Sequence, residues 1–156
     1  MILGSQLVRR IQRIIALPGG RKLAALLIGR AIPYTGTIEP LIQSVETGRA
    51  EVAMNDRRGV RNHLRSVHAI ALANLGEFTA NLAVVSRQPE GTRWIVTKME
   101  IAYVKKARGR LIASASAPEI AWERDGEITV ETIIRDPSSD VVARVHTTIK
   151  HGPAPA

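Results

Sequence analysis

Cysteine is absent from the 156 residues of this sequence. Its absence excludes disulfide bonds, thiolate catalysis and cysteine-ligated zinc, and it is typical of proteins in a reducing compartment. Aromatic residues are scarce, at 3%, whereas hydrophobic residues together make up 45%. We therefore expect one globular domain of ordinary size with an aliphatic core.

Acidic residues are missing from the first 32 positions, which hold six of the 22 lysines and arginines. The remainder carries 16 basic and 14 acidic residues, so most of the net charge of +8 is N-terminal. No apolar run is long enough for a transmembrane helix, and arginines interrupt any secretory signal. We expect a cytoplasmic protein whose residues 1–32 pack on the domain as helices. A transit peptide and a membrane-surface segment are the alternatives.

Several motifs are also absent. The sequence has no GxSxG nucleophile elbow, no GxGxxG and no phosphate-binding GxxxxGK[ST] motif. His63, His68 and Glu77 do not have the spacing of HExxH, so we expect no metal site. A pI near 10.8 raises nucleic-acid binding. We do not favour it, because no helix-turn-helix, zinc finger or aromatic stacking platform is visible.

Hydrophobic periodicity predicts short helices over about 5–17 and 21–32, separated by Pro18-Gly19-Gly20. The longest predicted helix is Val67–Val85, with Ser66 as its N-cap. It is apolar nearly all round, which is typical of a buried helix. Six segments are predicted to be strands: Gly36–Glu46, Arg49–Asn55, Arg93–Val104, Arg110–Ala117, Glu127–Arg135 and Val141–Lys150.

This order of elements indicates an α+β fold in which a curved antiparallel sheet wraps one long central helix, the hotdog fold. We expect an N-terminal helical extension at 1–32, a hotdog domain at 33–150 and a disordered tail at 151–156. On the strand Arg93–Val104, alternation places one set of residues on one face: Ile95, Thr97, Met99, Ile101 and Tyr103.

Polar residues interrupt the long helix at Asn74, Glu77 and Asn81, at positions i, i+3 and i+7 of one stripe. A carboxylate buried there without a partner would cost several kcal/mol, on the order of the penalty for an isolated charge. It must be paired, be protonated or face a wet cleft, and these environments also suit a general base or nucleophile. The alternatives are that Glu77 is half exposed or pairs with Arg87.

Asn62, His68 and Glu77 form the pattern N-x5-H-x8-E, with a loop-to-helix junction between the first two. The pattern resembles the active-site segment of hotdog-fold acyl-CoA thioesterases of the phenylacetyl-CoA and 4-hydroxybenzoyl-CoA types, in a poorly characterised branch. The resemblance implies that Glu77 is the nucleophile or the base, and that Asn62 positions water or the thioester. It further implies that the N–H of Ala69 polarises the thioester carbonyl and that His68 orients the loop or contacts substrate.

Two positions depart from that family's pattern. Ile70 replaces a small residue where substrate approaches closely, and Asn81 replaces a hydroxyl residue that supports the carboxylate. We expect both, together with Asn74, to lie in the substrate site. The departures leave a second hypothesis open, a non-catalytic acyl-CoA-binding or interaction protein on the same fold.

His68 and Glu77 are nine residues apart and so lie on opposite faces of an ideal helix. One subunit could not easily bring both to one substrate atom, whereas a two-fold dimer could. We therefore expect a homodimer that shares its sites, as the resemblance also implies, and that could pair into a homotetramer. The substrate would be acyl-CoA, with no separate cofactor.

Basic residues cluster in two predicted loops and could hold the phosphates of coenzyme A. Solvated turns are the alternative for each residue alone. The candidates are Arg58, Arg61, Lys105, Lys106 and Arg108.

Overall fold

The computed structural model of the protein describes residues 4–155. Its helices are α1 (Gly4–Ile15), α2 (Gly20–Ala31), α3 (Pro33–Gly36) and α4 (Ala69–Val85), with a 3-10 turn, η1, at Arg58–Val60. Its strands are β1 (Leu41–Glu46), β2 (Arg49–Met54), β3 (Thr92–Tyr103), β4 (Leu111–Ser116), β5 (Gly126–Arg135) and β6 (Val141–Pro153).

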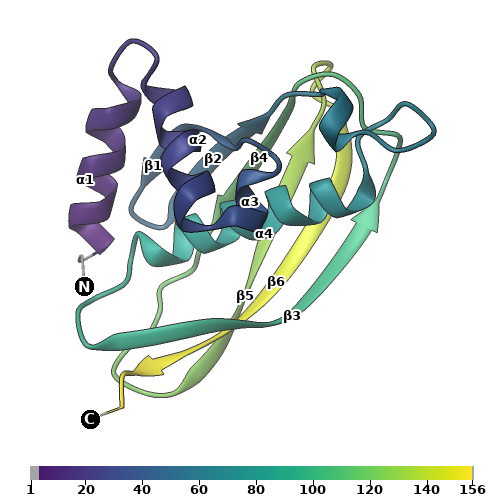
Figure 1. Ribbon diagram of the computed structural model, residues 1–156. Helices are drawn as coiled ribbons and strands as arrows, with labels where there is room; N and C mark the ends of the chain where they lie inside the picture. The colour runs from purple at the N-terminus through teal and green to yellow at the C-terminus, as the bar shows by residue number, and fades with distance from the viewer. Residues whose placement is uncertain (1–3, 156) are drawn as a thin grey trace.

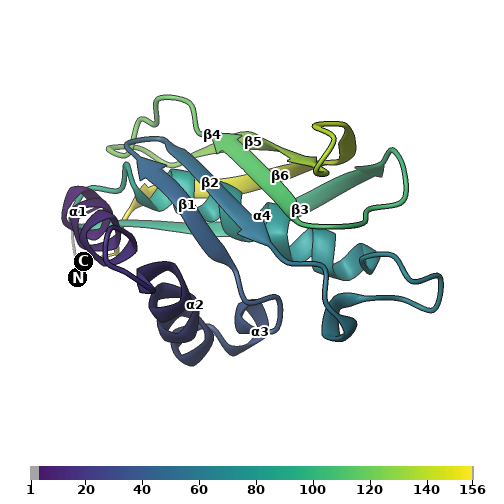
Figure 2. The same cartoon turned by 90° about the horizontal axis from the view of Figure 1, so that it is seen from above.

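The strands form one antiparallel sheet in the order β1-β2-β4-β5-β6-β3. Figure 1 shows the sheet curving around α4, with α1, α2 and α3 on the same side as α4, near β1. Figure 2, from above, shows α1 and α2 beside β1. This architecture is the predicted hotdog fold with N-terminal helices. β1 and β3 are its two edge strands.

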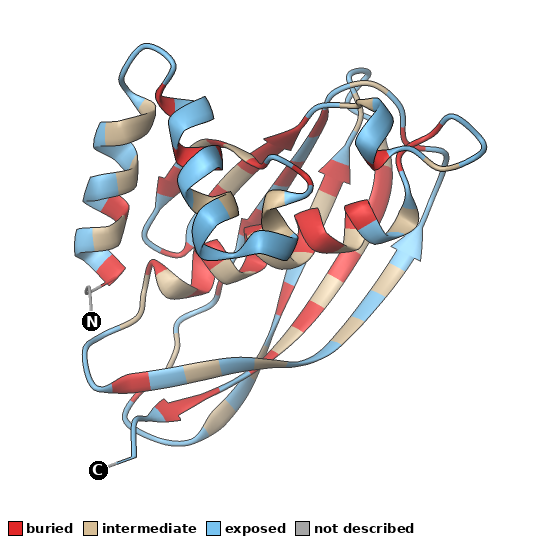
Figure 3. Ribbon diagram, in the orientation of Figure 1, coloured by how far each residue is buried: buried red, intermediate tan, exposed pale blue. Residues whose placement is uncertain are grey.

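The core between α4 and the sheet is aliphatic, as the scarcity of aromatic residues predicts. Leu75, Ala80, Ala83 and Val84 of α4 are fully or almost fully buried, and Figure 3 shows buried positions along α4 and the strands behind it. Gly76 permits the closest approach, because a Cβ there would lie 2.5 Å from Val145 Cγ2. Thr132 on β5 also donates a hydrogen bond to the Gly76 carbonyl oxygen at 3.0 Å.

The N-terminal helices are anchored to the domain. The N–H of Gly4 donates to the carbonyl oxygen of Gln88 at 3.0 Å, beyond the end of α4. The amide of Gln12 donates to the carbonyl oxygen of Val45 in β1 at 2.9 Å. Val8, Ala24 and Ala25 are buried, so both helices pack on the domain as expected. Within residues 4–155, no helix is both long and apolar enough to cross a bilayer.

Two predicted segments differ from the structure. Residues 36–40 are not in a strand, because Pro33 begins the one-turn helix α3 and β1 starts only at Leu41. Proline suits the first helical turn, where its missing N–H is not needed. The chain is also ordered beyond Lys150: β6 continues to Pro153, and His151 is buried against the edge of the Trp122 ring. The predicted disordered tail is therefore wrong for residues 151–153, and Ala156 lies outside the described residues.

The predicted single face of β3 is also wrong. The register shifts between Val96 and Lys98, which indicates a bulge. Before the bulge, the half-buried residues of β3 have even numbers, as Trp94 does. After the bulge, they have odd numbers, as Met99 does. Because a bulge inserts one unpaired residue, it moves every later side chain to the other face. Ile95 is therefore 65% exposed.

Candidate active site

The N-terminus of α4 carries four backbone N–H groups that cannot bond within the helix. Three of them are satisfied: the N–H of His68 donates to the Val60 carbonyl oxygen at 2.8 Å, the N–H of Ile70 donates to His68 Nδ1 at 3.0 Å, and the N–H of Ala71 donates to the His68 carbonyl oxygen at 3.0 Å. For the N–H of Ala69, no acceptor is recorded among residues 4–155. The helix therefore offers one free donor, on the residue whose N–H the family resemblance assigns to the thioester carbonyl.

The loop before α4 is organised by Asn62. Its Oδ1 accepts from the N–H of Leu64 at 2.9 Å, and from the N–H and the hydroxyl of Ser66, each at 3.2 Å. Ser66 is buried and turned into this loop, so its predicted role as N-cap is wrong and His68 is the cap. Within the described chain, no acceptor is recorded for the Asn62 amide nitrogen, which is the part of the side chain left to meet a ligand.

Glu77 lies in the middle of α4, half-buried. It lines a cavity of about 490 Å³ between α4 and the N-terminal helices. No hydrogen bond or ion pair to its carboxylate is recorded within residues 4–155. Arg87 pairs with Glu119 at 2.9 Å, so the alternative Glu77–Arg87 pair is not formed. The other alternative, a half-exposed Glu77, agrees with its intermediate burial. The carboxylate therefore faces a mostly apolar space without a protein partner.

The three polar residues of the predicted stripe do not share one environment. Asn81 lines the cavity with Glu77, and its Oδ1 is buried with no hydrogen-bond partner among the described residues. Asn74 is also buried, but its amide donates to the carbonyl oxygen of Tyr34 at 3.1 Å and holds α3 against α4. Asn74 thus positions the α3 segment, and Asn81 remains available to a ligand.

The two halves of the predicted site lie in different depressions. His68, Ile70 and Asn74 line a smaller one of about 260 Å³, which also includes Arg61. Glu77 lies eight residues after Ala69, about 12 Å further along the helix axis. A single thioester carbonyl cannot reach both the Ala69 N–H and the Glu77 carboxylate of one chain.

Asp56 joins the two basic loops beside the α4 N-terminus. Its carboxylate accepts from Arg61 Nε at 2.6 Å and from the N–H of Gly109 at 2.9 Å. The hydrogen bond from Arg61 lowers the pKa of Asp56, the Gly109 N–H and the Arg108 charge add to this, and burial opposes it. The Val67 N–H also donates to the Ala107 carbonyl oxygen at 2.9 Å, so the two loops are linked twice.

The predicted phosphate-binding residues differ in availability. Lys105 pairs with Asp136 at 2.7 Å and with Asp140 at 2.6 Å, and Arg61 is held by Asp56. Three exposed residues have no ion pair recorded within residues 4–155: Arg58, Lys106 and Arg108. These three are the cations most available to an anion.

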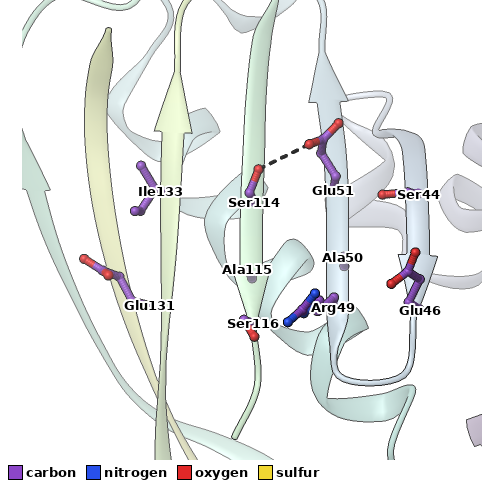
Figure 4. Close-up of a pocket in the computed structure, with 10 residues that line it drawn as sticks. All are labelled: Ser44, Glu46, Arg49, Ala50, Glu51, Ser114, Ala115, Ser116, Glu131 and Ile133. Atoms are coloured by element: carbon purple, nitrogen blue, oxygen red, sulfur yellow. Dashed lines mark hydrogen bonds between the residues drawn. The ribbon is translucent and has the colours of Figure 1, made fainter. Parts of the chain in front are cut away.

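A third hollow, of about 470 Å³, lies on the opposite face of the sheet from α4 (Figure 4). Ser114 and Ser116 of β4 line it, and it is rimmed by Glu46, Glu51 and Glu131, with Arg49 as the cation among its lining residues. Ser114 is hydrogen-bonded to Glu51 at 3.5 Å. An acidic hollow of this kind would repel an anionic ligand, so we place the site at α4. Among residues 4–155, no group of three or more potential metal ligands is found.

Several residues of the site were not predicted from the sequence. The N-terminal helices supply much of the wall around Glu77, including Ile11, Leu27 and Ile28. Tyr103 donates from its hydroxyl to the Ala69 carbonyl oxygen at 3.2 Å. Asp56 positions the basic loops. For α1 and α2, the amphipathic periodicity of the sequence predicts helices that pack on the domain. Periodicity does not predict which part of the domain these helices cover.

Comparisons with known proteins agree with this architecture. The sequence model of a family described as a domain of unknown function (DUF4442) matches residues 20–150. No curated protein matches the sequence. A structural-genomics protein, APC5556, is 30% identical over 95% of this chain and 99% of its own, with a TM-score of 0.84.

Two solved thioesterases share the fold at lower identity. A mutant of a Staphylococcus aureus thioesterase is 18% identical, covers 78% of this chain and 99% of its own, and has a TM-score of 0.69. A Haemophilus influenzae thioesterase is 13% identical, covers 82% of this chain and 87% of its own, and has a TM-score of 0.71. At this identity the likeness establishes the fold alone.

Proposed function

Because the chain belongs to the DUF4442 family and has a fold that solved bacterial thioesterases share, we propose that it hydrolyses acyl-CoA thioesters. The observation that carries the proposal is Glu77. A carboxylate with no protein partner, half-buried in an apolar cavity, loses hydration and gains nothing in return unless it serves a ligand.

The reaction needs a base and an oxyanion donor. As base, Glu77 takes a proton from a water molecule, whose oxygen bonds to the thioester carbon. The carbonyl oxygen becomes an oxyanion, stabilised by the free N–H of Ala69 and the positive end of the α4 dipole. The C–S bond then breaks, and the sulfur of coenzyme A leaves with the proton held by Glu77. As nucleophile, a carboxylate oxygen of Glu77 would bond to the thioester carbon, and the C–S bond would break to release coenzyme A as its thiolate. Water would then open the resulting anhydride, which restores the Glu77 carboxylate, frees the acid and supplies the proton that the thiolate takes up.

We propose that the two groups come from different chains. Glu77 and Ala69 of one chain are too far apart, whereas a two-fold axis brings Glu77 of one chain to the α4 N-terminus of its partner. Within the described sheet, β3 pairs on one side alone, so its other edge offers unpaired backbone groups to a second copy. Exposed apolar residues continue this edge beside the α4 N-terminus: Leu64, Ile70, Tyr103 and Val104.

Coenzyme A would enter beside the α4 N-terminus. Its phosphates would contact Arg58, Lys106 and Arg108, and Asn62 would orient the thioester or water through its free amide nitrogen. Asp56 fixes the loops that carry these groups.

A second candidate is binding of acyl-CoA without hydrolysis. Ile70 favours it: this bulky side chain is 51% exposed at the second position of α4, next to Ala69, where the related family has a small residue. Under this proposal the same residues bind the thioester, but no water is activated.

The experiment is release of free thiol from a panel of acyl-CoAs, followed with a thiol-reactive dye. The Glu77→Gln variant should lose at least about a hundredfold in kcat, the usual effect of removing a general base. Glu90→Gln, an exposed acid in the turn after α4, is the matched control and should behave as wild type. Tight acyl-CoA binding without thiol release would support the second candidate, and full activity of Glu77→Gln would refute the first.

A further inference from the structure

The cavity around Glu77 has walls from six elements. Its floor is α4, with Glu77, Phe78, Asn81, Leu82 and Val85, and Ile42 of β1, Thr35 of α3 and Trp94 of β3 add to it. The roof comes from the N-terminal helices: Leu7, Ile11 and Ile14 of α1, and Ala24, Leu27, Ile28, Ala31 and Ile32 of α2 and its end. Its volume lies within the range of about 300–1,000 Å³ typical of small-ligand sites.

Polar side chains are few in the lining of this cavity. They are Glu77, Asn81 and Thr35, and every other lining side chain is apolar. Beyond Asn81 the floor continues with Leu82 and Val85. The cavity is therefore polar near the proposed reaction centre and apolar along the rest of α4, a polarity that matches a thioester followed by a hydrocarbon chain.

The roof is held in place on both sides of the cavity. α1 is bonded to the chain after α4 through Gly4 and to β1 through Gln12. α2 is fixed by its buried residues Ala24 and Ala25. Because both helices are anchored, their side chains form a wall of defined position that can set the length of the chain beneath it.

We propose that this cavity binds an unbranched aliphatic acyl chain and that the α1–α2 pair determines the accepted length. The inference rests on the proposed thioesterase function, whose substrate class it specifies. From Glu77 to Val85, α4 rises about 12 Å. An extended hydrocarbon with bonds of about 1.5 Å, which zigzag, fills that distance with roughly eight to twelve carbons. Decanoyl-CoA is therefore the expected substrate rather than acetyl-CoA.

The test uses a tryptophan in the roof. Leu27 lines the cavity and is 47% exposed, so Leu27→Trp can narrow the cavity while part of the larger side chain remains in solvent. Its neighbour Leu26 is 62% exposed and does not line this cavity, so Leu26→Trp is the matched control. Each buried methylene strengthens binding about fourfold, so the wild type should prefer decanoyl-CoA to acetyl-CoA by about a hundredfold or more in kcat/KM.

Leu27→Trp should lower kcat/KM for decanoyl-CoA at least about tenfold and leave acetyl-CoA unchanged, while Leu26→Trp leaves both unchanged. Equal wild-type rates for both substrates, or an equal loss on both in Leu27→Trp, would overturn the inference.

Calorimetry separates this inference from the proposed function if no thioester is hydrolysed. Tighter binding of decanoyl-CoA than of coenzyme A, lost in Leu27→Trp and kept in Leu26→Trp, would then support the acyl site while hydrolysis fails. Equal binding of the two ligands would overturn the acyl site as well.

Discussion

Replacing Asp56 by alanine tests how the basic loops are held beside α4. The carboxylate is 8% exposed and accepts two hydrogen bonds, from Arg61 on its own loop and from the Gly109 N–H on the facing loop. Asp56→Ala removes both acceptors at once and leaves the Gly109 N–H without a partner. Asp56→Asn keeps the shape and one acceptor oxygen but removes the charge.

The expected cost follows from these two bonds. A hydrogen bond to a charged group contributes about 1.5–3 kcal/mol, but Arg61 can turn into solvent and recover part of that by hydration. We therefore expect Asp56→Ala to lower the free energy of unfolding by about 2–4 kcal/mol and Asp56→Asn by about half as much. The loosened loops should also raise KM for acyl-CoA more than they lower kcat.

Urea unfolding followed by circular dichroism measures the first effect, and thiol-release kinetics the second. The pKa of Asp56 is lowered in the fold by Arg61 and Gly109. Its contribution is therefore complete above the ordinary value of 3.8 and is lost as the pH falls through the lower folded value. The stability gap between wild type and Asp56→Ala should be constant from neutral pH to about pH 5 and close at more acidic pH. A gap below about 0.5 kcal/mol at neutral pH would refute the reasoning.

Two further predictions concern packing and assembly. Gly76→Ala should destabilise the protein by about 1–2 kcal/mol, because the clash with Val145 outweighs the helix propensity that alanine gains. Thermal unfolding should show that Val145→Ala removes most of this penalty in the double variant, and strictly additive effects would contradict the contact. Ile95→Lys on the edge strand β3 should shift the protein from dimer to monomer in light scattering, whereas Ile112→Lys on the inner strand β4 should not. A dimer that survives Ile95→Lys would place the interface elsewhere.

The fold could be predicted from the sequence because its main signals are local and strong. An almost wholly apolar segment of helical length before a series of alternating segments has few compact solutions, and a sheet around a buried helix is one of them. The predicted strand bounds and faces are wrong where one local sequence pattern is compatible with two structures. Pro33 ends one helix and begins another, and the bulge after Val96 has no clear sequence signal.

The site was less predictable than the fold. The pattern Asn62, His68 and Glu77 predicts a site at this segment, but in the structure Asn62 and His68 have structural roles as loop organiser and N-cap. A polar residue at a helix start serves capping and catalysis through the same atoms, so sequence cannot separate the two roles. The cavity is lined by residues about fifty to seventy positions apart in the sequence, such as Leu7 and Leu27 on one side and Glu77 on the other. Local sequence patterns do not predict which of them share one cavity.

The uneven charge of the chain also fits an anionic acyl-CoA. The arginines and the lysine of α1 and α2 are exposed, while the inner side of these helices is apolar and covers Glu77. Three further exposed cations, Arg58, Lys106 and Arg108, lie on the loops at the other end of α4. Positively charged side chains therefore lie on the solvent-exposed surface near both ends of α4, and the surface of the cavity beside α4 is apolar. Such a field draws a polyanionic carrier toward the groove, while the hydrocarbon it carries is stabilised only after it leaves water.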